Sequence, residues 1–246
     1  MRPNEPPVLD PESGSPNAQR VLLRGFALAA LACRGFIDYG ADNSEAEAVH
    51  TKLLHWLEGV PVDGEFSSEE AAIIHAPLGT LTETQIAGVT WGVEGLVVLS
   101  WALGFAELPP YDAQVDPYAV AEAIGLFDLE ASRQLHTVRL RCPEEIVAGR
   151  ELLYAINTRI REYLRSPVQG SRRPFQEWLD PEWLAVLKLP LETLVVDDEL
   201  AIAGQPAWRA SREQLTECEL IVRERHRAAI WLAGEEVNYW DVRVDT

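Results

Sequence analysis

The sequence predicts a mainly α-helical fold, a compact multi-helix domain around a buried central helix at about residues 86–106. Three observations support this prediction. Apolar residues recur every three or four positions along most of the chain. Helix-start signals precede several of these segments. Finally, every residue from 86 to 106 except Glu94 is apolar, glycine, serine or threonine, so this helix must be surrounded by others.

The N-terminal third is expected to hold three helices before the central one. Asn17 is a suitable N-cap for a first helix, whose apolar stripe stops near Gly40. A second helix is expected over residues 44–58, and a short third helix after Ser67. Thr82 then leads into the central helix.

In the middle of the chain, the expected helices begin at a proline. Asp116 followed by Pro117 is a good N-cap with proline at the first helical position, and short helices are expected over residues 117–134. Pro143, followed by two glutamates, begins the longest helix, which we expect to reach about Arg165.

The C-terminal third is expected to contain two helices and a small sheet. Residues 178–189 fit a helix that Pro190 ends, and residues 193–203 fit one short β-hairpin. The last helix has a capping box at its start, formed by Ser211 and Gln214, and Gly234 is its natural stop.

The predicted domain organisation is simple. Residues 1–16 contain five prolines and no periodic apolar face, which predicts a disordered tail. Residues 17–246 are expected to form a single helical domain, since 230 residues are enough for one sizeable core.

The composition narrows the classes of partner. The chain has 21 Lys and Arg against 39 Asp and Glu, a net charge of -18, which argues against binding nucleic acid or an anionic membrane and favours a basic protein partner. Its three cysteines stand far apart and in no CxxC spacing. They indicate neither a disulfide framework nor a zinc site, so we expect a cytoplasmic protein without a metal or cofactor.

The central segment is long enough to cross a membrane, but its charges favour a buried helix. Glu83 and Glu107 flank it where lysine or arginine would be typical, and Glu94 lies inside it. Residues 133–173 form a basic island with nine basic and four acidic side chains. These arginines could dock an anionic ligand or pair with acidic groups of the same chain, and the second is the more common arrangement.

Glu94 requires a partner, because an unpaired carboxylate in an apolar interior would cost several kcal/mol. Helical periodicity places Arg150 and Arg225 on apolar faces, with His226 at the edge of one, whereas Arg159 is expected to point away. Glu94 is therefore expected to be buried and to engage Arg150 or Arg225. Trp91 and Trp101 fall within the same arc of its helix and complete the candidate polar network or pocket.

Five segments carry a resemblance to a known family: Trp91-Gly92-Val93-Glu94, Leu99-Ser100-Trp101-Ala102-Leu103-Gly104, Arg150 with Leu153-Tyr154, Glu224-Arg225-His226-Arg227-Ala228 with Trp231-Leu232, and the closing Trp240-Asp241 and Asp245-Thr246. Together they resemble the bacterial family catalogued as domain of unknown function 4272, over most of the chain after residue 17. The resemblance implies kinship with small, mostly helical proteins and brings no activity with it.

Two functions of different classes are compatible with the sequence. The chain has no GxSxG elbow, P-loop, GxGxxG or HExxH, which favours a non-enzymatic interaction or accessory protein with an acidic surface. The alternative is a small-molecule binder or hydrolase that uses an interhelical pocket around Glu94, Arg150, Arg225 and His226. Solvent access to Glu94 separates them: a dry, fully paired carboxylate favours the first function, and a water-filled cavity favours the second.

Overall fold

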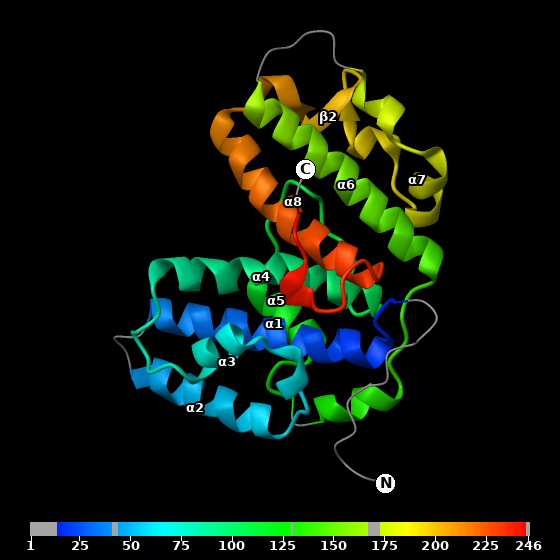
Figure 1. Cartoon of the computed structure of the whole chain (residues 1–246). Coiled ribbons are helices and arrows are strands. Elements are labelled where there is room, and N and C mark those ends of the chain that lie inside the picture. Colours follow the sequence, from blue (N-terminus) through cyan, green and yellow to red (C-terminus); the bar gives the residue numbers. More distant parts are fainter. Residues whose placement is uncertain (1–13, 41–43, 129, 167–172, 245–246) are drawn as a thin grey trace.

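The computed structural model describes residues 14–40, 44–128, 130–166 and 173–244, and the fold of these residues is mainly α-helical with one small antiparallel sheet (Figure 1). The helices are α1 (Ala18–Tyr39), α2 (Ser44–Glu58), α3 (Ser68–His75), α4 (Glu83–Ala102), α5 (Pro117–Ile124), α6 (Pro143–Arg165), α7 (Pro181–Leu187) and α8 (Arg212–Leu232). Short 3-10 turns join several of them. The predicted fold class is confirmed.

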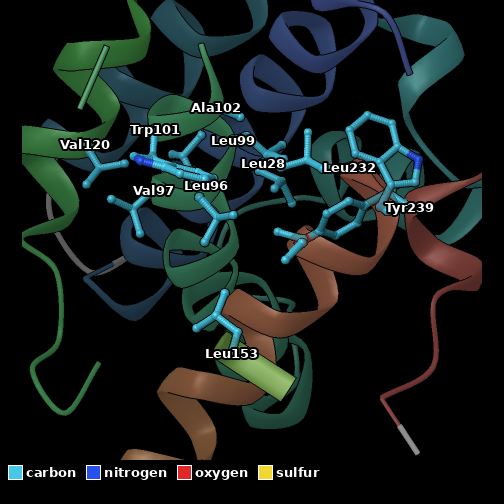
Figure 2. Packing of buried hydrophobic residues seen from close by; sticks show 14 of the residues in the cluster. Leu28, Leu96, Val97, Leu99, Trp101, Ala102, Val120, Leu153, Leu232 and Tyr239 are labelled. Atoms are coloured by element: carbon cyan, nitrogen blue, oxygen red, sulfur yellow. The ribbon is translucent and has the colours of Figure 1, made fainter. Parts of the chain in front are cut away.

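Helix α4 lies at the centre of the fold. It packs most extensively against α1 on one side and α8 on another, and α6 in turn packs against α8 (Figure 1). Figure 2 shows Leu96, Leu99 and Trp101 of α4 within the apolar core, together with side chains of other elements, among them Leu28 and Leu153.

The prediction that residues 86–106 are one buried helix is only partly right. The helix begins earlier, after the capping Thr82, and ends at Ala102, where Gly104 adopts a left-handed φ of 75°. Burial is continuous only from Gly92 to Ala102, and the turns before Gly92 are half-buried or exposed. Uniform apolarity therefore did not predict uniform burial along the helix.

Two glycines allow the close packing around α4. A Cβ atom at Gly35 of α1 would lie 2.6 Å from a methyl group of Val89. A Cβ atom at Gly95 would lie 2.3 Å from the hydroxyl of Tyr239, which is buried after α8. Any larger residue would separate these elements, so both glycines are packing positions.

The helix-start signals are largely confirmed. Asn17, Ser67, Thr82, Asp116 and Ser211 each accept a backbone N–H in the first turn of the helix they precede. The expected helix over residues 178–189 is wrong at both ends, since α7 spans Pro181–Leu187 and Trp178 ends a separate 3-10 turn. The start follows from Asp180 and Pro181, the same pairing that opens α5.

The predicted hairpin is present and gains a third strand. β1 (Val195–Val196) pairs antiparallel with β2 (Glu199–Ile202), and β2 pairs antiparallel with β3 (Gln205–Pro206). The first turn places Asp197 and Asp198 at φ of 51° and 63°, a conformation that aspartate tolerates and tight hairpins require.

The predicted tail falls mostly outside the described residues, since residues 1–13 are not described. Residues 14–16 lie against the end of α8, where the Ser15 hydroxyl donates to the carbonyl of Ala233 at 3.2 Å. The domain boundary at residue 17 stays a prediction. Within the described ranges, none of the helices combines the length and apolarity that crossing a membrane requires.

Candidate functional site

Glu94 and Arg225 form a buried ion pair between α4 and α8. The side chains of both are only 1% exposed. The guanidinium Nε and Nη2 of Arg225 lie 2.9 and 2.7 Å from Glu94 Oε2, and the backbone N–H of Val115 donates to Oε1 at 3.0 Å. Both carboxylate oxygens thus have partners, and the prediction that Glu94 engages Arg225 is confirmed.

Both members of this ion pair also form hydrogen bonds with the segment that connects α4 to α5. The other N–H groups of Arg225 donate to the carbonyls of Pro110 at 2.9 Å and Ala113 at 2.7 Å. Because Val115 also donates to Glu94, both partners of the ion pair bind this connection. The donors of Arg225 that do not bind Glu94 are thus satisfied by loop carbonyls, which offsets the cost of burying the charge.

Arg150 does not join this network, which corrects the prediction. Its side chain is 29% exposed and forms ion pairs with Glu151 and Glu235. Helical periodicity placed Arg150 on the packed face of α6, but a long arginine can carry its charged end from the edge of such a face to solvent. The predicted pocket is therefore divided, with Glu94 and Arg225 inside and Arg150 outside.

His226 is more deeply buried than its predicted edge position. It is 3% exposed, and its ring centroid lies 5.8 Å from that of Tyr154 on α6. The Nδ1 atom has no hydrogen-bond partner within the described structure. Burial, reinforced by the charge of Arg150, lowers the pKa of His226 to about 4, so its imidazole is neutral at neutral pH.

The two tryptophans have different surroundings. Trp101 is buried, and the guanidinium of Arg141 lies 5.3 Å from its ring centroid. Its indole also limits Gly149 of α6, where a Cβ atom would lie 3.0 Å from it. Trp91 is only half-buried, in the less covered half of α4. The polar partners of Glu94 are thus Arg225 and Val115, and the indoles do not provide them.

Four further buried arginines were missed from the sequence. Arg20 pairs with Glu65 at 3.0 Å. Arg24 binds both oxygens of Glu70, at 2.6 and 3.0 Å, and Arg34 binds Asp38 and the carbonyls of Ala76 and Pro77. Arg159 was expected to point away, but it is 1% exposed and binds both oxygens of Glu199 at 2.8 Å.

The sequence did contain a signal for the burial of two of these arginines. Arg24 and Arg34 interrupt an apolar run much as Glu94 does, so the reasoning applied to Glu94 also applies to them. No comparable signal marks Arg159, because the partner that buries it lies on β2, 40 residues away. Among the arginines of the basic island, Arg133, Arg141, Arg150, Arg159 and Arg173 all pair with carboxylates of this chain, as the intramolecular alternative predicted.

An apolar groove lies on the opposite side of α4 from Glu94. It encloses about 490 Å³ between α1, α2, α4 and α5, and its walls include Phe36, Val49, Leu96, Ala121 and Phe127. Tyr118, 81% exposed, stands at its rim. The groove also contains Cys33, whose thiol has a pKa raised to about 11 by burial, so it is protonated and weakly nucleophilic at neutral pH.

A second, polar cavity of about 380 Å³ lies between α6, α8 and the segment that follows α8. Arg150, Tyr154 and His226 line it, together with carboxylates of both helical and C-terminal residues. We refer to it as the His226 cavity. It brings together two of the predicted site residues, Arg150 and His226, without Glu94 or Arg225. In the described ranges no three His, Cys, Asp or Glu side chains are grouped so that they could hold a metal ion.

Comparison with known proteins identifies one family. A family model described as domain of unknown function DUF4272 matches residues 1–184, which extends from the N-terminal tail into α7. The resembling motifs around Arg150 and Glu94 lie within this match, whereas those around Arg225 and Trp240 lie beyond it. No curated protein and no solved structure matches the chain.

Proposed function

The chain belongs to the DUF4272 family, whose description names no activity, and we propose that the protein is a non-enzymatic interaction protein that binds a basic, amphipathic segment of another protein. The observation that carries the proposal is the apolar groove with its exposed aromatic rim on a strongly acidic molecule. Exposed apolar surfaces of this kind in soluble proteins are typical of binding sites.

The dry environment of Glu94 supports this proposal over the alternative. Both of its oxygens are occupied by Arg225 and Val115, and the side chain is 1% exposed. A general acid or base must reach the substrate proton directly or through one water, and Glu94 is engaged in holding a loop. The hydrolase alternative therefore loses its principal candidate residue.

The negative charge of the protein supports a positively charged partner. Five buried arginines and five buried carboxylates cancel within the described structure, so the net charge of -18 belongs to the remaining residues. Glu45 lines the groove, and Asp116 and Glu122 adjoin groove residues on α5. Lys52, 4.3 Å from the ring of Phe127, is the cation beside them. A helix with one apolar and one basic face matches both properties of this surface.

The cysteines support a reducing compartment. Cys33, Cys142 and Cys218 are all free thiols. We therefore place the proposed interaction in the cytoplasm, where thiols stay reduced.

The test is binding of two designed helical peptides, one of leucine and lysine and one with glutamate in place of lysine. Their apolar faces are identical. We expect the lysine peptide to bind at least about tenfold more tightly at low salt, and less tightly as NaCl rises. Ala121→Trp, which fills the groove, should weaken binding, whereas Ala87→Trp on the exposed part of α4 should not. Equal binding of both peptides, or no effect of Ala121→Trp, would contradict the proposal.

A further inference from the structure

The walls of the apolar groove that α2 and α5 form differ in charge. On the α5 side, Asp116 and Glu122 adjoin groove residues, and α5 contains no basic residue. The α2 side carries both signs of charge, a carboxylate from Glu45 and an ammonium group from Lys52. A partner helix that is basic all along its edge would therefore meet a like charge at Lys52.

Glu45, Val49 and Lys52 follow one face of α2. They are four and three residues apart, a spacing that places side chains above one another along an α-helix. Glu45 and Val49 line the groove. The seven residues from Glu45 to Lys52 correspond to two helical turns and a rise of about 10 Å. The α2 wall is thus acidic at one end and basic at the other.

Two interactions place the ammonium group of Lys52 at the groove. Its Nζ lies 4.3 Å from the ring centroid of Phe127, which lines the groove. Burial raises the pKa of the Cys33 thiol, another lining group, to about 11, and the nearby charge of Lys52 opposes this rise. The aromatic face attracts the ammonium group, whose N–H donors can still bind a carboxylate.

Both charged groups of the α2 wall are accessible to a partner. Glu45 and Lys52 are exposed. Among the described residues of α2, His55 and Glu58 form an ion pair, and neither Glu45 nor Lys52 takes part in it. Charges at the edge of an apolar interface mainly select the partner and its register, because a like charge opposite either group is repelled.

From these positions we propose that the partner helix carries a basic residue opposite Glu45 and an acidic residue opposite Lys52, two helical turns apart. The inference rests on the proposed function, since it assigns a charge pattern to the same basic, amphipathic segment. The apolar face of that helix fills the groove, and its edge toward α5 is basic. The single acidic residue on the edge toward α2 sets the register of the bound helix.

The test compares two leucine-rich helical peptides of identical composition and net charge. The facing peptide has a lysine and a glutamate seven residues apart along one edge of the leucine stripe. In the displaced peptide, that glutamate exchanges places with a lysine on the outer face. We expect calorimetric titration of the full chain at low salt to show about fivefold tighter binding of the facing peptide, and NaCl should reduce the difference.

Three variants of α2 assign this preference to Lys52. Lys52→Glu reverses the charge and should make the displaced peptide the tighter ligand. Lys52→Met keeps an apolar contact with Phe127 and should remove the preference. Glu47→Lys is the control, because it reverses an exposed charge about 200° around the helix from Glu45 and should leave the preference unchanged.

Alkylation of two cysteines reports where the peptides bind. Either peptide should slow the reaction of Cys33 with iodoacetamide, since Cys33 lines the groove, and leave the exposed Cys142 at the start of α6 unaffected. Equal binding of both peptides to the wild-type protein, or a preference that Lys52→Glu does not change, would overturn the inference and leave the proposed function standing. Absence of binding, or binding without protection of Cys33, would overturn both.

Discussion

Two arginine–carboxylate pairs of this protein use the same chemical groups in different surroundings. Glu94 and Arg225 are each 1% exposed, and the N–H groups of the arginine are bound by the carboxylate and by loop carbonyls. Arg150 and Glu235 are 29% and 43% exposed at the mouth of a cavity. Desolvation makes the first pair costly to break, whereas water can replace either partner of the second. The comparison separates a buried pair that connects elements of the fold from a partly exposed pair that borders a cavity.

The largest effect is expected at the inner pair. Glu94→Ala leaves Arg225 charged and buried without its carboxylate, and should lower the free energy of unfolding by about 3–5 kcal/mol. Glu94→Gln keeps an acceptor and should cost less. Urea unfolding followed by circular dichroism measures both. A loss below about 1 kcal/mol for Glu94→Ala would mean that the inner pair does not differ from the outer one.

An intermediate effect is expected from His226 as the pH is lowered. Its folded pKa of about 4 lies below the ordinary value near 6.5, so below 6.5 the unfolded state binds the proton more readily. The stabilising contribution is complete above about pH 6.5 and is lost between there and about pH 4. It should amount to on the order of 2 kcal/mol between pH 7 and pH 5.

The control for this prediction is His226→Phe, which cannot titrate. Carboxylates with lowered pKa values, such as Glu70 beside Arg24 and Asp38 beside Arg34, lose their contribution only at lower pH, below their ordinary values near 4. Because other groups also titrate, the histidine is isolated by the difference between the wild-type and variant proteins in the change of unfolding free energy from pH 7 to pH 5. Equal pH dependence in the wild-type and variant proteins would show that His226 titrates normally.

The smallest effect is expected at the outer pair. Glu235→Ala should change the free energy of unfolding by at most about 1 kcal/mol, because Arg150 keeps Glu151 and gains water. The remaining contribution should weaken further in high salt. Chemical denaturation at 0.05 and 0.5 M NaCl measures this. A loss as large as that for Glu94→Ala would remove the distinction between the pairs.

Local signals in the sequence predicted the elements well. Asn17, Thr82 and Ser211 mark helix starts because a side-chain oxygen satisfies the first free N–H groups, and this chemistry is local. The short hairpin within residues 193–203 was also predicted from the local sequence, and Asp197 and Asp198 form its turn. The depth of Arg159 and the exposure of Arg150 were not predicted, because they depend on β2 and on Glu235, which are distant in sequence.

The candidate site was likewise predicted only as far as local sequence signals allow. A carboxylate within an apolar segment predicts that it needs a partner, and Arg225 is that partner. The sequence does not show that the other side of α4 borders a groove, since Val93 and Leu96 resemble any buried residues of an apolar helix. A cavity depends on how four helices leave space between them, and no local pattern describes that space.

Our central claim is that the Glu94–Arg225 pair stabilises the fold, whereas the apolar groove binds the partner. One calorimetric titration with the leucine and lysine peptide tests this claim most directly. The variants are Glu94→Gln and Ala121→Trp, measured beside the wild-type protein. α4 presents Leu96 to the groove and Glu94 to Arg225, so Glu94→Gln should lower stability and leave peptide affinity within about twofold. Ala121→Trp should lower affinity by at least about tenfold with little change in stability. Loss of peptide binding in a folded Glu94→Gln protein, with Ala121→Trp binding normally, would contradict the account.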